Sequence, residues 1–256
     1  DRGPSALIEA SGALELYDIE TDSEVYKRGI YTAGPLDLYR SPEKMVKQVE
    51  SAVEALLAEK KLVVTIGGEH SVTCGAVGSY KRNFPGLSVL QIDAHSDLRD
   101  EYEGSKYNHA CVMARVKEIC PIAQVGIRSM SAEEKGSFDG RCMFFAENIV
   151  SGYDWIERVV SRLADDVYVT IDLDVFDPSL MPSTGTPEPG GMGWYQVLAL
   201  LKAVAEKKRV AGFDVVGQRA VGNRQQIRQQ ADLVQVYEGL ARGALSQDLV
   251  ELLEDA

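Results

Sequence analysis

Histidine is scarce in this sequence, and cysteine occurs without the spacing that metal or redox sites need. The 256 residues include only three histidines and four cysteines, and no two cysteines form a C-x-x-C pair. This spacing argues against a zinc knuckle and against a thioredoxin-type redox site. Scattered, unpaired cysteines are typical of a reducing compartment, so we expect a cytoplasmic protein with inert core thiols.

Long apolar runs and clusters of basic residues are also absent. No apolar segment approaches the length of about 18 residues that a membrane-spanning helix needs, so we expect no membrane partner. Lys and Arg are dispersed and the formal net charge is −12, which argues against nucleic acid as a partner. Such a charge attracts small cationic molecules by electrostatic steering. The alternative is that the charge serves only to keep the protein soluble.

The chain has the size of one α/β domain with a substantial core. No internal repeat, low-complexity tract or linker rich in Pro and Gly divides it, so we predict a single domain over residues 1–256. The first residue is Asp1 rather than Met, and we therefore expect that the native N-terminus is missing.

Short β-branched runs alternate with helical patterns along the chain. The runs predict strands at 62–66, 87–92, 121–127, 142–145, 167–171 and 210–216. Helices are predicted at 42–60, from residue 71 onward, at 153–163 and at 194–207. Ser41 before Pro42 is a good N-cap for the first of these helices. Strands that are apolar on both faces and separated by helices indicate a three-layer α/β/α fold with a mainly parallel central sheet.

Ligand-type side chains follow three of these strands, at the sheet edge where α/β folds bind their ligands. The strand ends read GGEH at 67–70, DAHSD at 93–97 and DLD at 172–174. In an extended backbone, residues i, i+2 and i+4 face the same side, so Asp93, His95 and Asp97 converge. Asp172 and Asp174 converge for the same reason. Carboxylates packed this closely repel one another in a partly buried cleft, and a bound cation relieves the repulsion.

The types of donor indicate which cation fits. The four aspartates of these motifs supply four negative charges, which two divalent ions would cancel. Carboxylates and imidazoles without thiolate suit Mn²⁺, with Zn²⁺, Co²⁺ and Ni²⁺ as alternatives. Two such ions about 3.5–4 Å apart can share a water and lower its pKa, which creates a hydroxide nucleophile at neutral pH. All three histidines, His70, His95 and His109, lie in these motifs or in the loop beyond them.

The ordered motifs GGEHS, DAHSD, DLDVFDP and PSTGTPEPGG resemble those of the ureohydrolases, the family of arginase and agmatinase. The resemblance runs from about residue 3 to residue 216. The acidic loop at 98–108 is similar to that of agmatinases, although a solvated surface loop explains it equally well. The resemblance implies an arginase-like fold, two Mn²⁺ ions, and the hydrolysis of a small cationic guanidino substrate, agmatine, to putrescine and urea in polyamine biosynthesis. It also implies a homo-oligomer, either a trimer or a hexamer.

The resemblance further implies a role for each residue of the motifs. One ion would be held by His70, Asp93, Asp97 and Asp172, and the other by His95, Asp93, Asp172 and Asp174. Asp93 and Asp172 would therefore bridge the two ions. Asp97 would also orient the bridging hydroxide, and His109 would protonate the leaving amine. Thr186 would support the guanidinium pocket.

One departure from the family concerns the end of the last strand. The family reads GFDVVE there and its Glu clamps the guanidinium, whereas this chain reads GFDVVG and has Gly217 instead. Losing a buried, charged contact to a cation costs about 2–5 kcal/mol. Residues 217–256 depart from the family pattern, with a helical pattern only at 231–244. Two alternatives to an active agmatinase therefore stay open: a hydrolase of another guanidino or formimino compound, and a catalytically impaired metal-binding homologue.

Overall fold

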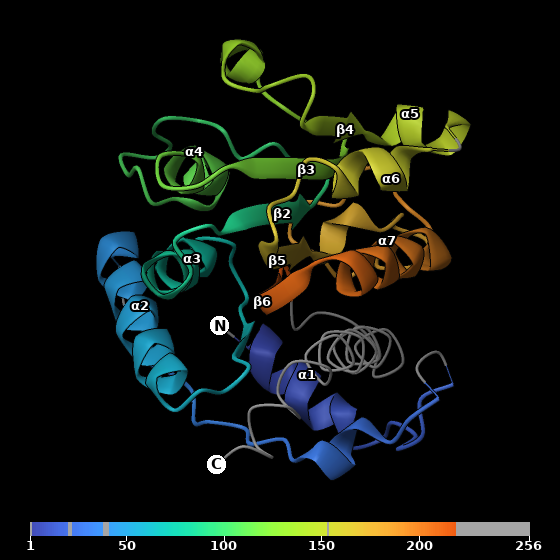
Figure 1. Ribbon diagram of the computed structural model, residues 1–256. Coiled ribbons are helices and arrows are strands. Elements are labelled where there is room, and N and C mark those ends of the chain that lie inside the picture. The colour runs from blue at the N-terminus through green and yellow to red at the C-terminus, as the bar shows by residue number, and fades with distance from the viewer. Residues whose placement is uncertain (1, 20–21, 38–40, 153, 219–256) are drawn as a thin grey trace.

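The computed structural model describes residues 2–19, 22–37, 41–152 and 154–218. Its centre is a six-stranded sheet in the order β1-β6-β5-β2-β3-β4, in which every pair of neighbouring strands is parallel (Figure 1). The strands are β1 (Val64–Ile66), β2 (Ser88–Ile92), β3 (Ile122–Ile127), β4 (Met143–Phe145), β5 (Asp166–Asp172) and β6 (Arg209–Val216). All six predicted strands are present, with small differences at their ends. The predicted helix at 231–244 and nearly all of the divergent segment at 217–256 lie outside the described residues.

Helices cover both faces of the sheet, so the predicted three-layer α/β/α fold is confirmed (Figure 1). One face carries α2 (Pro42–Ala58), α3 (Val72–Asn83) and α4 (Val112–Lys117). The other face carries α5 (Ala146–Ser151), α6 (Trp155–Val160) and α7 (Trp194–Lys207). A further helix, α1 (Gly3–Ser11), lies beyond the β1 edge of the sheet. Short 3₁₀ helices are η1 (Val25–Arg28), η2 (His109–Cys111), η3 (Ala132–Gly136) and η4 (Leu173–Val175).

The sequence does not predict three of these helices, α1, α4 and α5. They contain nine, six and six residues, so each offers few repeats of a 3.6-residue periodicity. The six-residue α6 was predicted as part of the longer pattern at 153–163. The longer α2 and α7, with 17 and 14 residues, agree closely with their predicted ranges. The predicted N-cap of α2 is confirmed, since the backbone N–H of Lys44 donates to Ser41 Oγ at 3.4 Å.

The strands direct alternate side chains into two apolar cores. In β2, Val89 packs in the core beneath α2 and α3, whereas Leu90 packs in the core beneath α6 and α7. Both side chains are fully buried. Because both faces of the parallel sheet are covered, its strands read as continuous apolar runs rather than as an alternation of apolar and polar residues.

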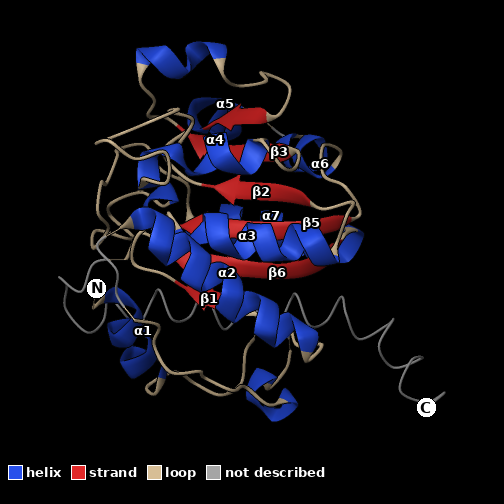
Figure 2. Ribbon diagram, turned by 90° about the vertical axis from the view of Figure 1, so that its left-hand side faces the viewer, coloured by secondary structure: helices blue, strands red, loops and turns tan. Residues whose placement is uncertain are grey.

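All strands end at one edge of the sheet, where the arrowheads lie on the left in Figure 2. From β2 the chain continues through β3 and β4 toward one side of the sheet, whereas β5, β6 and β1 lie on the other side. The strand order therefore reverses between β2 and β5, and ligands of open α/β sheets bind at such a reversal. The motifs that follow β2 and β5 meet at this point.

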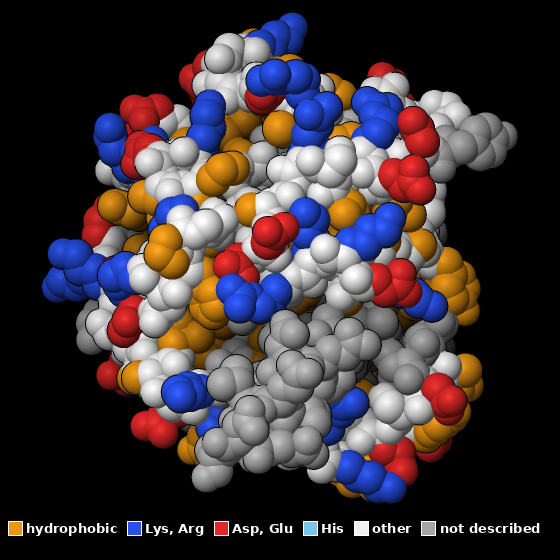
Figure 3. All heavy atoms as spheres, viewed as in Figure 1, with side chains coloured by type: hydrophobic (Ala, Val, Ile, Leu, Met, Phe, Trp, Pro, Cys, Tyr) orange, Lys and Arg blue, Asp and Glu red, His pale blue; other side chains and the backbone are white. Residues whose placement is uncertain are grey.

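Neither the surface charges nor the cysteines test the predicted binding partners or the predicted cytoplasmic location, so both stay predictions. Among the helices that the structure describes, none combines the length and the apolar character that a membrane crossing requires. On the face drawn in Figure 3, Lys and Arg side chains are interspersed with those of Asp and Glu. Cys74, Cys111 and Cys120 are buried and Cys142 is half-buried.

Helices α2 and α3 bring their backbones close together at Gly75. A Cβ atom at Gly75 would lie 2.3 Å from the carbonyl oxygen of Val46 and 3.0 Å from the backbone nitrogen of Glu50. We predict that Gly75→Ala pushes the helices apart and lowers the free energy of unfolding by about 1–3 kcal/mol, as denaturant titration would measure. Gly86→Ala is the control, because its added methyl group meets no atom within 4 Å. Equal stability of the two variants would contradict the prediction.

Candidate metal centre

Three chain segments bring ligand-type side chains to the carboxyl edge of the sheet. Those that follow β2 are Asp93, His95 and Asp97, and those at the end of β5 and in η4 are Asp172 and Asp174. His70 follows β1, which is separated from β5 by β6. The turn before α3 nevertheless brings its ring to β5, where His70 Nε2 lies 2.9 Å from Thr170 Oγ1.

The first group of ligands surrounds the ring of His70. Its Nδ1 atom lies 3.0 Å from Asp97 Oδ2, 3.2 Å from Asp93 Oδ2 and 3.6 Å from Asp172 Oδ2. This nitrogen is buried and makes no well-formed hydrogen bond within the described part of the chain. A buried imidazole nitrogen that faces three carboxylate oxygens fits a cation held among them, because burial leaves these atoms without water as a partner.

The second group surrounds the ring of His95. Its Nδ1 atom lies 3.1 Å from Asp174 Oδ2 and 3.7 Å from Asp93 Oδ1. Asp93 therefore turns one carboxylate oxygen toward each histidine, and it is the residue that the two groups share. Two neighbouring groups of this kind are arranged to hold two ions side by side.

A chain of hydrogen bonds sets the orientation of the His70 ring. The Thr170 hydroxyl donates to Asp214 Oδ1 at 2.6 Å, so its oxygen accepts from the N–H at His70 Nε2. Asp214 is fully buried and also accepts from the hydroxyls of Thr73 and Tyr168, at 2.9 and 2.8 Å. With its proton on Nε2, the ring presents the lone pair of Nδ1 to the carboxylates, as a metal ligand must.

Crowding and burial change the pKa values of the ligands. Burial, followed by the charges of Asp174 and Asp93, holds the pKa of Asp172 well above its usual range. Burial and the charge of Asp93 raise the pKa of Asp97 to about 6. Burial alone would lower the pKa of His70, but the adjacent carboxylates of Asp93 and Asp97 hold it well above its ordinary value. The site therefore favours positive charge, and a divalent ion competes with protons for these groups.

Comparison with known proteins identifies the family to which this chain is similar. A sequence model of the arginase family matches residues 1–223. The chain belongs to the arginase family. Over 227 residues it is 40% identical to the N(1)-aminopropylagmatine ureohydrolase of Synechocystis sp., an alignment that covers 84% of this chain and 74% of that protein. Over 233 residues it is 36% identical to the agmatinase of Pyrococcus horikoshii, with 84% and 75% covered.

A solved structure supports the arginase-family assignment independently. The agmatine ureohydrolase of Thermoplasma volcanium superimposes with a TM-score of 0.86 at 30% sequence identity. The superposition covers 96% of this chain and 85% of that one. The fold therefore agrees with the family that the sequence resembles.

His109 lies at the rim of the arginase-family site, on η2. Its side chain is 49% exposed, and its Nδ1 atom lies 3.4 Å from Glu69 Oε1. The hydrogen bond with Glu69 raises the pKa of His109, although partial burial acts in the opposite direction. Asn108 caps η2, since its side chain accepts the backbone N–H of Ala110. The structure thus brings an imidazole with a raised pKa to the rim, while its role as proton donor stays a prediction.

The two predicted substrate positions contact the ligands of β5 and η4. Thr186 Oγ1 donates to Asp174 Oδ2 at 3.2 Å. Gly217 follows β6 and has a φ of +80°, and a Cβ atom there would lie 2.1 Å from Asp172 Oδ1. A glutamate at position 217 would overlap Asp172 in this backbone conformation. The substrate roles of both positions stay predictions.

Two polar residues inside the strands support the ligands but were not singled out from the sequence. Gln91 Nε2 donates to Asp93 Oδ2 at 2.7 Å, and Thr170 contacts His70. Each precedes a ligand aspartate by two residues and so faces the same side of its strand. An isolated polar residue at that spacing, in an otherwise apolar run, is the signal that identifies both. Asp214 is also a polar residue in an apolar run, but it precedes no ligand aspartate, and its contact with Thr170 joins residues 44 apart in the sequence.

We predict that Glu69→Gln lowers the pKa of His109 toward its ordinary value. The variant removes the carboxylate that stabilises the imidazolium, so His109 loses its proton at lower pH. NMR titration of the metal-free protein measures this, and a chain with three histidines gives a simple spectrum. Glu101→Gln is the control, since Glu101 is an exposed residue of the loop before His109. An unchanged titration of His109 in Glu69→Gln would show that another group raises its pKa.

Proposed function

We propose that this chain is a binuclear manganese hydrolase that cleaves the guanidino group of agmatine and releases putrescine and urea. The observation that carries the proposal is the pair of ligand groups that share Asp93 at the carboxyl edge of the sheet. Membership of the arginase family, and relatives named as ureohydrolase and agmatinase, support the class of reaction. Oxygen and nitrogen donors without thiolate support Mn²⁺ as the metal.

The side chains of the site have separate roles at the ligands and at the rim. The residues that would hold the ions are His70, Asp93, His95, Asp97, Asp172 and Asp174. The metal pair, when bound, supplies a water activated for attack on the guanidinium carbon. Asp97 would orient that water by a hydrogen bond. His109, which Glu69 keeps protonated to higher pH, donates a proton to the leaving amine nitrogen.

N(1)-aminopropylagmatine is a second candidate substrate. The relative from Synechocystis sp. carries that substrate in its name and is 40% identical to this chain. The compound keeps the guanidino group of agmatine and adds an aminopropyl arm, so the same metal centre can cleave it. Recognition of the added amine is what separates the two substrates, and the exposed acidic side chains of the loop at 98–108 favour a substrate with several positive charges.

The proposed activity predicts urea release that depends on metal and substrate. With Mn²⁺ bound, we expect urea from agmatine or N(1)-aminopropylagmatine and little from arginine, because the acidic loop disfavours an α-carboxylate. A chelator that removes the metal abolishes the release. Asp93→Asn is the control, since it removes the carboxylate that both ligand groups share. Two bound Mn²⁺ ions per chain without urea from any of the three substrates would identify a catalytically impaired homologue instead.

We predict that Gly217→Glu weakens metal binding rather than restoring the family's glutamate clamp. The left-handed backbone disfavours a side chain at position 217, and that side chain would displace Asp172. We expect the affinity for Mn²⁺ to fall by about 10–100-fold, the usual effect of disturbing the surroundings of a ligand. Gly190→Glu is the control, because Gly190 has a φ of +75° with open space around it. Tighter Mn²⁺ binding or faster urea release in Gly217→Glu would overturn the prediction.

A further inference from the structure

Arg128, the residue that follows β3, connects three backbone segments around the second group of ligands. Its guanidinium donates to six carbonyl oxygens: those of Gly126 (3.2 Å), Asp174 (2.6 Å), Val175 (3.2 Å), Phe176 (3.4 Å), Glu188 (3.0 Å) and Pro189 (3.1 Å). These carbonyls belong to the end of β3, to η4 with the residue after it, and to the loop that precedes α7. The shortest of the six bonds reaches the backbone of Asp174, a ligand residue.

The backbone of Arg128 holds the ligand motif after β2. Its N–H donates to the carbonyl of Ala94 at 2.8 Å, and Ala94 stands between Asp93 and His95. The N–H of Ala94 in turn donates to Asp174 Oδ1 at 3.2 Å. One residue therefore fixes the relative position of the two segments that supply the second group.

The same arginine positions a carboxylate near His95. Glu188, whose carbonyl accepts from the guanidinium, has its Oε1 atom 3.7 Å from His95 Nε2. The Nδ1 atom of His95 faces the ligand carboxylates, so Glu188 lies on the outer side of the ring. At 3.7 Å this is an electrostatic contact rather than a hydrogen bond, and the negative charge of Glu188 favours an N–H at His95 Nε2.

A bulge at the end of β3 makes this approach possible. Gly126 has a φ of +90°, and the pairing of β3 with β4 shifts register between Val125 and Ile127. A Cβ atom at Gly126 would lie 2.6 Å from a side-chain carbon of Val175 and 3.0 Å from the carbonyl oxygen of Asp93. A glycine bulge re-aims the residues that follow it, here Arg128 toward η4.

We propose that Arg128 is a positioning residue for the metal ion held by Asp93, His95 and Asp174, and that the ion held at His70 does not depend on it. This inference rests on the two-metal function proposed above. The guanidinium suits the task because it presents five N–H donors in one rigid plane, whereas a lysine ammonium has three on a flexible stem. The ring of His70 is held separately, by Thr170 and Asp214.

The test follows Zn²⁺ binding to the full chain by NMR of the histidine rings. Zn²⁺ is diamagnetic, so the signals of His70 and His95 report the two sites separately, at free Zn²⁺ concentrations set by a competing chelator. In the unmodified chain both signals change. In Arg128→Met we expect the His70 signal to change at the same free Zn²⁺ concentration as in the unmodified chain. The His95 signal should need about 10–100-fold more Zn²⁺. Arg128→Lys should fall between the two, because it keeps the charge but loses the planar set of donors.

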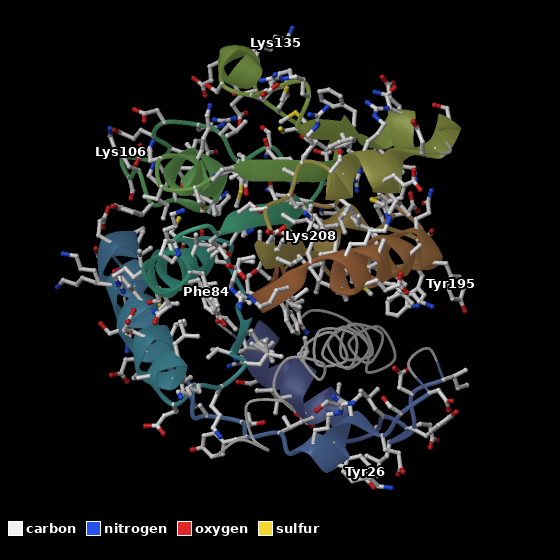
Figure 4. The ribbon with its side chains drawn as sticks, in the orientation of Figure 1. Tyr26, Phe84, Lys106, Lys135, Tyr195 and Lys208 are labelled. Carbon is white, nitrogen blue, oxygen red and sulfur yellow. The ribbon has the colours of Figure 1, made fainter. Side chains whose placement is uncertain are left out.

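The reciprocal variant is Thr170→Val, which removes the hydroxyl that orients His70. We expect the opposite pattern, with weaker binding at His70 and unchanged binding at His95. Lys208→Met is the matched control for loss of a mostly buried cation, since Lys208 Nζ donates to the carbonyl of Leu163 at 2.9 Å. Lys208, labelled in Figure 4, lies between the end of α7 and the start of β6. The ligands follow the other ends of the parallel strands, the carboxyl ends. This variant should leave both histidine signals as they are.

Two results in Arg128→Met would overturn the inference. One is an equal loss of Zn²⁺ affinity at His70 and His95, and the other is an unchanged Zn²⁺ affinity at His95. If Arg128→Met does not fold, the Zn²⁺ affinity at each histidine is measured in Arg128→Lys instead. An unchanged affinity at His95 in Arg128→Lys would also overturn the inference. An unmodified chain that binds no Zn²⁺ at His70 and His95 refutes the proposed two-metal function itself. Normal binding of two ions by the unmodified chain and by Arg128→Met refutes only the role of Arg128.

Discussion

Repulsion among buried carboxylates is the constraint on which the rest of the site depends. Four aspartates share one edge of the sheet, and each is less than a tenth exposed: Asp93, Asp97, Asp172 and Asp174. Burial and mutual charge raise the pKa of three of them, whereas His70 and His95 offset burial and keep the pKa of Asp93 low. Two imidazoles alone cannot neutralise four carboxylates. The cluster is therefore stable as four charged groups only with bound cations.

Groups that repel one another must be held in place from outside. Gln91 donates to Asp93, the backbone N–H of Ala94 donates to Asp174, and Thr170 accepts from His70. Thr170 lies at Nε2 of the His70 ring, on the side away from the carboxylates at Nδ1. An unpaired buried polar group costs about 1–3 kcal/mol, so these supports both align the ligands and satisfy groups that burial separates from water. Polar residues thus occur in strands that are otherwise apolar.

The convergence of the candidate ligands was predictable from the sequence because they lie close together within short motifs. The residues that support them were not predictable because they are distant in the sequence. Period-2 alternation after a strand is enough to bring Asp93 and His95 to one side. The contact of Thr170 with Asp214, by contrast, requires β6 to lie beside β5. No local sequence pattern predicts that these two strands are neighbours. The role of Arg128 depends on the backbone turn at Gly126, so its position after a strand is not informative by itself. Long α2 and α7 were likewise predictable, and the six-residue α4 was not.

Position 217 has a different meaning in the structure from the one that the sequence suggests. From the sequence, Gly217 is a missing carboxylate. In the structure, Val216 is paired with Asp172, and the chain then turns with a φ of +80° so that the backbone of Gly217 packs against the Asp172 carboxylate. A side chain there would compete with a ligand for space, so this backbone has no room for a clamp at the end of β6. For the proposed function, metal binding and grip on the guanidinium would therefore be separate properties, and the grip would come from residues other than the one at position 217.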